Sequence, residues 1–486
     1  VKLFKHMLGF KMQYYDKSAV GRLVTRAVSD IETIASIFSQ GLFMIISDLL
    51  KMLVVIGVMF YKSWELTLLV LTVLPFIIYA TRVFQKKMKL AFEEVRTQVA
   101  DLNTFVQERI TGMKIVQLFT REKTEYENFK KINDKHRKAW VKTVWYNSIF
   151  FPIAEMSTSI TIGLIVWFGG LRVVAGDDMS LGIIVAFIEL SQMLFRPLRQ
   201  IADKFNTLQM GMVAANRVFG ILDTESTIED NGTIAVEHLD GEIEFKDVRF
   251  SYIPEEEVVK GISFRVEPGE TVAIVGATGA GKSTIINLLS RFYEIDSGVI
   301  EIDGQDIKDL ELKSLRSQIA VVLQNVFLFA DTIMNNINLD NPDISDEDVI
   351  KAAKQIGIHE FIDSLPGGYY YNVKERGAML SSGQRQLISF LRAYVSNPSI
   401  LVLDEATSSV DSYSEQLIQD ATDKITEGRT SIVIAHRLAT IKKADKIIVM
   451  DQGKIVEIGN HQSLLQRTDG YYRKLYEVQF KEEESI

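Results

Sequence analysis

Four apolar stretches within the first 200 residues constrain the fold of this chain more than any other feature. They mark spans near residues 31–61, 64–81, 149–171 and 179–200. The clearest one runs from Leu66 to Ala80 without a charged residue, between Trp64 and Arg82. Because ~20 predominantly apolar residues cross the ~30 Å core of a bilayer as a helix, we expect each stretch to span a membrane. The alternative is a soluble bundle of four buried helices.

Basic residues set the orientation of these spans. Residues 82–142, between the second and third spans, carry 15 Lys and Arg against 8 Asp and Glu. Such an excess marks the cytoplasmic side of a membrane protein. Because four spans return the chain to its starting side, we expect residue 1, this basic segment and everything after residue 200 to share the cytoplasm. The sequence therefore predicts an integral protein of the plasma (inner) membrane with a cytoplasmic C-terminal domain.

Composition removes several classes of protein. The chain has no cysteine, which excludes structural disulfides, thiolate metal sites and a cysteine nucleophile. Its six histidines are scattered and form no HExxH motif, which argues against a zinc enzyme. No secretory signal pattern opens the chain. It starts at Val1, and we expect an N-terminal piece to be missing.

Residues 82–146 predict a long helical hairpin. They have helical composition throughout, contain no proline and are interrupted by Gly112. Two arms of ~30 residues each reach ~45 Å at 1.5 Å per residue, which is far more than crossing the membrane interface requires. The tip, around residues 112–120, is expected in the cytoplasm, where it can touch another domain. The alternative is a solvated hairpin with no mechanical role.

The hydrophobic periodicity changes near residue 240. Residues 242–245 and 298–304 alternate like half-buried strands. Three continuous apolar runs, residues 319–323, 400–403 and 431–435, suit a sheet that is covered on both faces. The C-terminal half is therefore predicted to be an α/β domain.

A complete phosphate-binding loop follows a strand expected at residues 271–275. Its residues are Gly276, Ala277, Thr278, Gly279, Ala280, Gly281, Lys282 and Ser283, and Thr284 opens the apolar helical run behind it. This is the P-loop pattern in its strand–loop–helix context. Glycines let backbone N–H groups turn around the phosphates, Lys282 reaches the β- and γ-phosphates, and Ser283 can ligate Mg²⁺. A P-loop alone leaves kinase, GTPase, motor and transporter open.

Two acids at the end of a buried strand favour hydrolysis. Residues 400–403 are followed by Asp404, placed to hold Mg²⁺, and Glu405, placed to polarise an attacking water. Since a kinase must exclude water, an acid beside the metal-binding aspartate indicates a hydrolase. The alternative is that Glu405 is a solvated strand end.

Further motifs, in a fixed order, make the sequence resemble the ATP-binding cassette (ABC) transporter family. The matching residues are Tyr252 for the aromatic that stacks on adenine, Gln324 for the Q-loop glutamine, Ser381, Ser382, Gly383 and Gln384 for the signature motif, Asp411 for the D-loop and His436 for the switch histidine. Each would be unremarkable alone. Their joint order and spacing carry the resemblance.

The resemblance implies an all-α transmembrane domain followed by an α/β P-loop ATPase domain with a helical subdomain. The expected boundaries are 1–222 for the transmembrane domain, 223–239 for a linker rich in Asp, Glu, Thr and Gly, and 240–486 for the cassette. Two cassettes would sandwich two ATP molecules, each held by one P-loop and the other protomer's signature motif. His436 would bond the γ-phosphate and orient the water, and Gln324 would touch Mg²⁺ and report the nucleotide state to the membrane part.

The membrane half also looks like an exporter-type half-transporter. Residues 4–8, 21–23 and 196–198 carry that likeness, and coupling helices are expected at about residues 16–21 and 112–119. A complete exporter half has six spans. This chain matches from the cytoplasmic end of the second span onward, so we expect the first span and most of the second to be missing.

Ser382 departs from the family pattern, because the signature motif usually has glycine there. In families that pair unlike halves, this change often accompanies an intact glutamate such as Glu405, with the altered signature facing the partner's degenerate site. We therefore favour a heterodimer with a second half-transporter over a homodimer. A tolerated variant in a homodimer is the alternative.

The predicted protein is half of an ATP-driven exporter with ATP and Mg²⁺ as cofactors. It would move a hydrophobic or amphipathic drug, lipid or peptide out of the cytoplasm, with the bilayer and a second half as partners and no nucleic acid. The alternative is a non-transporting ABC protein whose ATPase gates or regulates a membrane partner. Asp48, Lys51, Glu155 and Glu189 lie in or near apolar spans and are candidates for substrate contact.

Overall fold

The computed structural model describes residues 1–176, 179–226, 230–404, 412–435 and 437–479, without the side chains of residues 40, 154, 198–206, 209 and 412–414. The chain divides into two compact units. The first is formed by Val1–Met7 and Val20–Thr224, and the second by Leu8–Ala19 and Glu225–Ile486.

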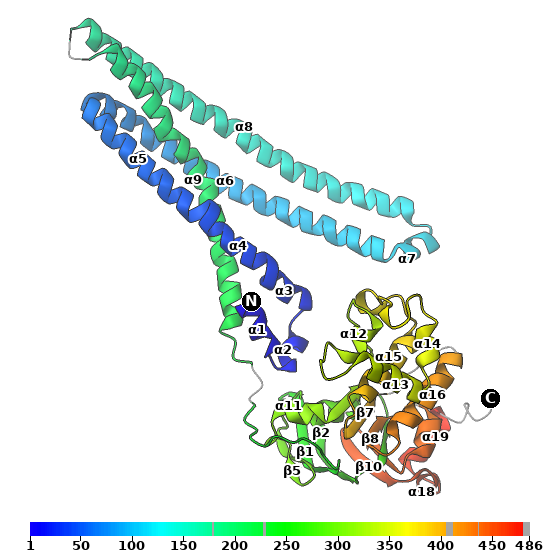
Figure 1. Cartoon of the computed structure of the whole chain (residues 1–486). Helices are drawn as coiled ribbons and strands as arrows, with labels where there is room; N and C mark the ends of the chain where they lie inside the picture. The colour runs from blue at the N-terminus through cyan, green and yellow to red at the C-terminus, as the bar shows by residue number, and fades with distance from the viewer. Residues whose placement is uncertain (177–178, 227–229, 405–411, 436, 480–486) are drawn as a thin grey trace. The chain divides into compact units, whose positions relative to one another are not determined.

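The first unit is entirely helical in its described part, and four of its helices are long (Figure 1). They are α1 (Lys2–Leu8), α3 (Val20–Thr25), α4 (Ile31–Ser36), α5 (Phe43–Lys62), α6 (Trp64–Thr111), α7 (Met113–Leu118), α8 (Glu122–Val174) and α9 (Leu181–Leu222). Two π-helical segments, η1 (Arg26–Asp30) and η2 (Ile37–Leu42), join α3, α4 and α5 into one continuous run. Ser63, between α5 and α6, caps α6 by accepting a hydrogen bond from the amide of Leu66.

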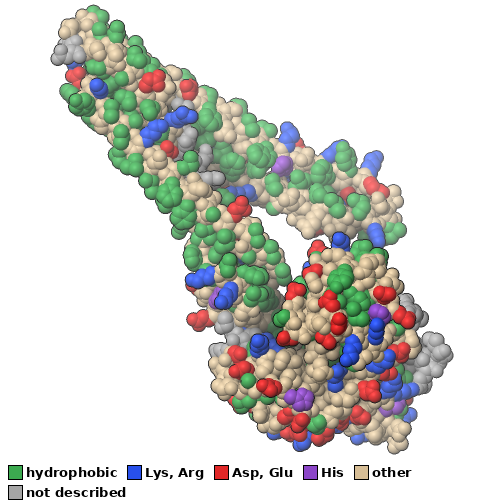
Figure 2. Space-filling model, in the orientation of Figure 1, with side chains coloured by type: hydrophobic (Ala, Val, Ile, Leu, Met, Phe, Trp, Pro, Cys, Tyr) green, Lys and Arg blue, Asp and Glu red, His purple; other side chains and the backbone are tan. Residues whose placement is uncertain are grey.

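The apolar helices have the length that a membrane requires. Among the described residues, Val20–Lys62, Trp64–Thr111 and Glu122–Val174 are long and apolar enough to cross a bilayer. Figure 2 shows hydrophobic side chains spread over the visible surface of these helices. These three helices contain the first three predicted spans, which stay predictions. The fourth, near residues 179–200, lies in α9 and stays a prediction, since part of its side chains is not described.

The predicted hairpin is present, with α6 and α8 as its arms and α7 at its tip. Near the apolar part, the rings of Phe84 and Phe150 stack with centroids 4.0 Å apart. Further along the arms, Lys142 Nζ donates a hydrogen bond of 2.6 Å to Glu94 Oε2. Contacts at separate levels therefore join the two arms into one element.

The second unit is the predicted α/β domain. Its strands are β1 (Ile243–Ile253), β2 (Glu256–Val266), β3 (Thr271–Gly276), β4 (Ser297–Ile302), β5 (Gln305–Asp306), β6 (Ile319–Val322), β7 (Ile400–Asp404), β8 (Thr430–Ile434), β9 (Lys446–Asp451) and β10 (Lys454–Gly459). Its helices are α2 (Met12–Lys17), α10 (Lys282–Leu289), α11 (Leu312–Ser317), α12 (Ile333–Asn338), α13 (Asp346–Ile356), α14 (His359–Asp363), α15 (Ser382–Val395), α16 (Ser412–Thr426), α17 (Leu438–Lys443), α18 (His461–Leu465) and α19 (Tyr471–Gln479). Short 3₁₀ turns lie at η3 (Gly368–Tyr370) and η4 (Glu375–Gly377).

Two sheets organise this domain. The larger has the order β10-β9-β3-β8-β7-β6, and the smaller has the order β2-β1-β4-β5. In the larger sheet β9, β3, β8, β7 and β6 run parallel, so their carboxyl ends meet at one edge. In an open α/β sheet, ligands bind outside that edge.

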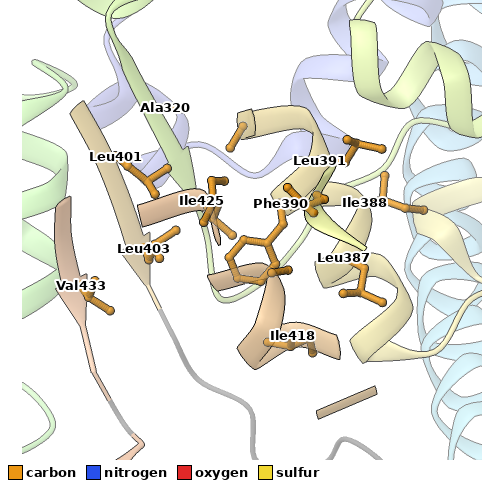
Figure 3. Packing of buried hydrophobic residues seen from close by; sticks show 14 of the residues in the cluster. Ala320, Leu387, Ile388, Phe390, Leu391, Leu401, Leu403, Ile418, Ile425 and Val433 are labelled. Atoms are coloured by element: carbon orange, nitrogen blue, oxygen red, sulfur yellow. The ribbon is translucent and has the colours of Figure 1, made fainter. Parts of the chain in front are cut away.

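Both faces of the larger sheet are covered. Leu401, Leu403 and Val433 pack into one core with helices α15 and α16. Figure 3 shows these strand residues opposite Phe390 of α15 and Ile425 of α16. Their neighbours along the strands, such as Val402, pack into a second core on the opposite face. The continuous apolar runs of the sequence therefore correspond to strands buried on both faces, as predicted.

The segment before β1 is bonded to this domain. The amides of Thr233 and Ile234 donate to the carbonyl of Asp309, and Leu239 is buried in a domain core. Helix α9 ends at Leu222. The domain boundaries drawn from the sequence, with a linker at residues 223–239, stay a prediction.

Candidate functional site

The phosphate-binding loop connects β3 to α10, as predicted. Gly276 ends β3 with φ +155°, and a Cβ atom there would lie 2.2 Å from the carbonyl oxygen of Met450 in the neighbouring strand β9. Gly281 caps α10 in the left-handed conformation with φ +97°. Both positions therefore require glycine, because a side chain would clash at the first and be strained at the second. The loop emerges at the carboxyl edge of the sheet.

Lys282 is the first residue of α10 and is buried in the loop. Its Nζ donates hydrogen bonds of 2.8 Å to the carbonyl of Gly276 and 3.0 Å to that of Ala277. Burial lowers the pKa of Lys282, while the nearby charge of Asp404 opposes this shift. The loop carbonyls hold the ammonium at the site, so a phosphate group can take their place as its partner.

A cavity of about 350 Å³ opens beside this loop. Its lining residues are Val258, Thr278, Gly279, Gly281, Lys282, Ser283, Thr284, Gln324, Asp404 and Ile434. Eight of them were predicted as site residues from the sequence, and the cavity brings them together. Sequence reasoning missed Val258 and Ile434, which are apolar strand residues with no motif of their own. Ala280 is buried behind the loop, where its carbonyl accepts a hydrogen bond from the amide of Gly453.

Strand order explains how Asp404 reaches the loop. Asp404 ends β7, the P-loop follows β3, and only β8 separates the two strands. Ser283, Gln324 and Asp404 thus bring a hydroxyl, an amide and a carboxylate to one cavity. Oxygen donors of this kind suit Mg²⁺, which keeps several waters and binds through one or two carboxylates and substrate phosphates. Among the described residues, no group of three His, Cys, Asp or Glu forms an all-protein metal site.

Tyr252 lies next to the cavity on β1, in a cluster of three aromatic rings. Its ring centroid is 4.8 Å from that of Phe250 and 5.0 Å from that of Tyr293, both edge-to-face. Its hydroxyl donates to Thr284 Oγ1 at 3.3 Å and accepts from Asn287 Nδ2 at 3.1 Å. The structure thus places the predicted adenine-stacking ring against the helix that follows the P-loop. Asn287 and Tyr293 were not predicted from the sequence.

Tyr293 also contacts the first predicted coupling position. Its hydroxyl donates a hydrogen bond to the carboxylate of Asp16, at the end of α2. Burial raises the pKa of Tyr293, and the hydrogen bond to Asp16 raises it further. The segment Leu8–Ala19 belongs to the same compact unit as the cassette. A residue expected to couple the membrane part to the cassette is therefore bonded to a neighbour of the Tyr252 ring.

The predicted signature motif forms a helix start. Ser381 caps α15, its hydroxyl accepting from the amide of Gln384 at 3.2 Å, while Gln384 Oε1 accepts from the amide of Ser381 at 2.9 Å. This is a reciprocal capping box. The helix begins at Ser382, so Ser382 and Gly383 lie in its first turn. Such a start offers amide donors and positive potential to an anion.

The signature residues do not line the cavity. Among the described residues, the lining of the cavity does not include Ser381, Ser382, Gly383 or Gln384. Within one chain, the cavity is therefore built by the P-loop and the strand ends.

Three predicted site residues lie outside the described part of the chain. They are Glu405, Asp411 and His436, whose roles stay predictions. Asp404 directly precedes Glu405 in the sequence and ends β7. Ala435 directly precedes His436 and follows β8, at the same carboxyl edge of the sheet.

The four charged candidates in the spans are distributed over three helices. Asp48 and Lys51 lie on α5, Glu155 on α8 and Glu189 on α9. Glu189 and Glu155 are exposed on the surface of the first unit. Their contact with a substrate stays a prediction.

Comparison with known proteins agrees with this geometry. The family model described as the ABC transporter transmembrane region matches residues 1–198, and the one described as ABC transporter matches residues 259–408. The uncharacterized ABC transporter ATP-binding protein YknV of Bacillus subtilis (strain 168) is 39% identical over 479 residues, covering 98% of this chain and 79% of that protein. An ATP-dependent lipid A-core flippase of Haemophilus influenzae (strain 86-028NP) is 39% identical over 481 residues, covering 99% and 82%.

A solved structure is similar over nearly the whole chain. It is that of a bacterial Atm1-family ABC exporter with ATP bound, with a TM-score of 0.77 and 29% sequence identity. The match covers 98% of this chain and 83% of the other. The helical unit and the cassette therefore both have counterparts in one solved exporter.

Proposed function

Because this chain belongs to the ABC transporter family and has the architecture of an exporter half, we propose that paired cassettes clamp ATP to move a hydrophobic or amphipathic substrate outward. The chain is an integral membrane protein with a cytoplasmic ATPase domain, and ATP hydrolysis in that domain is coupled to transport. The fold class expected from the sequence is confirmed. The substrate, the partner and the individual site residues are the parts that we propose.

The observation that carries the proposal is the shared cavity of the P-loop and the strand ends. Lys282 and the loop amides would bind the β- and γ-phosphates, and Tyr252 would stack on the adenine. Ser283, Gln324 and Asp404 would hold Mg²⁺. When bound, this ion supplies positive charge that offsets the negative charge of the phosphates. Glu405 would accept a proton from the attacking water, and His436 would orient that water against the γ-phosphate.

We predict that Glu405→Gln separates ATP binding from turnover. The amide keeps the size of the side chain but cannot accept the proton, so phosphate release should fall by the ~10²–10⁴-fold typical of a lost general base. ATP affinity should stay near that of the parent protein. Steady-state phosphate release and equilibrium ATP binding on the full-length protein measure the two effects. Phosphate release within twofold of the parent would remove Glu405 from this role.

A second copy or a related half would complete each site. The signature residues lie outside the cavity of their own chain, and their helix start offers amides to a γ-phosphate. We propose that the signature motif of one protomer closes over the ATP held by the other. The clamp would bring the two cassettes together only when ATP is bound.

We propose that the partner is an unlike half. Ser382 in the signature motif beside Glu405 is the feature that supports a heterodimer. The test expresses two differently tagged copies of this chain together and measures whether one tag retrieves the other in the presence of ATP. We expect one tag to retrieve little of the other when this chain is expressed alone. When a related half is expressed with it, we expect the two halves to be retrieved together. A stable, ATP-hydrolysing pair made only of this chain would show a homodimer.

The transported substrate is proposed only by chemical class. A relative is described as a lipid A-core flippase, which supports an amphipathic substrate for this chain. Exposed apolar residues cover the membrane helices, so a hydrophobic compound can reach them from the bilayer. ATP-dependent uptake of hydrophobic compounds into inverted vesicles tests the proposal. Stimulated ATPase activity without uptake of any compound would favour a protein that gates a partner.

A further inference from the structure

The orientation of the Tyr252 ring is set by side chains of α10, the helix that begins at Lys282. Thr284 and Asn287 are three residues apart, so they lie on the same face of that helix. Both bond the Tyr252 hydroxyl, at 3.3 and 3.1 Å. One tyrosine oxygen is therefore tied to two positions of the phosphate-binding helix.

These hydrogen bonds form a directed chain. The Asn287 amide has hydrogens to give, so the tyrosine oxygen accepts from it and its own hydrogen points to Thr284 Oγ1. Hydrogen bonds arranged in sequence polarise and strengthen one another. Thr284 is buried and directly follows Ser283, which lines the cavity. These hydrogen bonds thus run from Asn287, through the Tyr252 hydroxyl, to Thr284 in the lining of the cavity.

Neighbouring rings restrict the remaining freedom of Tyr252. Tyr293 lies at 88° to it and Phe250 at 86°, so both contacts are edge-to-face. Aromatic pairs of this geometry contribute beyond their buried area. With its hydroxyl fixed by α10 and its sides held by two rings, Tyr252 has a defined position before a base arrives.

We propose that Asn287 is a positioning residue for base recognition, which fixes the Tyr252 ring at a set distance from the P-loop. The proposal rests on the proposed role of Tyr252 in stacking on adenine. A ring that is already held loses less freedom on stacking, so preorganisation raises the affinity for a nucleotide. It leaves the affinity for a phosphate chain without a base unchanged, since Asn287 does not line the cavity among the described residues.

The test compares ADP with pyrophosphate as ligands of the full-length protein. We expect Asn287→Ala to weaken ADP binding by about two- to tenfold, the range for loss of one neutral hydrogen bond, and to leave pyrophosphate binding unchanged. In steady state the variant should raise the KM for ATP in the same proportion, with kcat near that of the parent. Gln462→Ala, which removes an exposed amide on α18, is the matched control and should change neither ligand.

A double-mutant cycle separates positioning from general packing. Tyr252→Phe keeps the ring and removes the hydroxyl, so it should weaken ADP binding as much as Asn287→Ala does. Because both changes break the same hydrogen-bond chain, the double variant should be no weaker than either single one. Tyr252→Phe also tests the proposal from the other end of the bond should Asn287→Ala fold poorly.

The outcomes distinguish this inference from the proposed function. Equal weakening of ADP and pyrophosphate by Asn287→Ala, or additive effects in the cycle, would overturn the positioning role alone. Tyr252→Ala is the test of the adenine contact itself. If that variant binds ADP as tightly as the parent, the proposed adenine site is wrong, whatever Asn287 does.

Discussion

At Gly276 a single methyl group is too large for the space between two strands. The would-be Cβ lies 2.2 Å from the carbonyl oxygen of Met450, a backbone atom that cannot rotate away. The residue also has φ +155°, which side chains rarely adopt. The close approach of β3 and β9 therefore fixes the start of the phosphate loop.

We predict that Gly276→Ala destabilises the cassette and abolishes ATP binding. The unfavourable backbone conformation costs ~1–2 kcal/mol and overpacking costs a further ~1–3 kcal/mol. Either the strand or the loop must shift, which displaces the carbonyl that holds Lys282. Thermal unfolding and equilibrium ATP binding measure the two effects.

Gly269→Ala is the matched control for this change. Gly269 also has a positive φ, +75°, but a Cβ there would meet no atom within 4 Å. It should lower stability by the backbone cost alone and leave ATP binding intact. Equal losses in the two variants would show that conformational strain, and not the close approach to Met450, governs Gly276.

In helix α15, two residues of the signature motif also form the cap of the helix. Ser381 and Gln384 close a capping box at the start of α15, which leaves this end of the helix fixed without a ligand. Helix α13 in the same domain begins with an equivalent box, formed by Ser345 and Asp348. The two serine caps are therefore the same local structure, and of this pair only Ser381 belongs to a predicted nucleotide-binding motif.

We predict that Ser381→Ala and Ser345→Ala have similar effects on stability and different effects on function. Loss of a serine cap costs ~0.5–2 kcal/mol in either helix. Only Ser381→Ala should weaken the ATP-driven association of two halves, because only its helix start would meet the partner's ATP. Thermal unfolding and ATP-dependent co-purification of the full-length proteins provide the measurements. Equal association in both variants would separate the signature motif from the dimer contact.

The strands and the loop were predictable because their signals are local. Residues 400–403 are a continuous apolar run, and the structure places them in β7 with both faces buried. Val258 and Ile434 line the cavity, but as apolar strand residues they look in the sequence like any other buried strand position. The contacts of Asn287 with Tyr252 join residues 35 positions apart, so no local pattern announces them. Packing between elements decides those contacts, and sequence periodicity does not report it.

For the molecule as a whole, transport should depend on residues that the ATPase does not need. Glu189 lies on α9, exposed on the surface of the first unit within a predicted span. Ionisable groups at such depth are costly and commonly functional. We predict that Glu189→Gln changes the relative uptake of several substrates while ATPase activity stays near that of the parent. A fivefold change in the uptake ratio would correspond to ~1 kcal/mol of discrimination.

The control for this prediction removes a charge outside the apolar run. Asp101→Asn changes an exposed residue of α6, beyond the stretch that ends at Ala80, and should leave the uptake ratio unchanged. Uptake into inverted vesicles with paired substrates gives the ratio directly. An identical ratio for Glu189→Gln across all substrates would assign this carboxylate to folding or assembly.

The joined arms of α6 and α8 also set how far a small movement can travel. The stacked rings of Phe84 and Phe150 and the hydrogen bond between Lys142 and Glu94 oppose sliding of one arm along the other. Two helices that are joined along their length resist bending more than a single helix does. A tilt of about 5° over ~45 Å of helix carries the far end through ~4 Å, about three quarters of the ~5.4 Å pitch of a helix. A small change in the angle of the hairpin at α7 would thus become a larger displacement at the membrane end of the two arms.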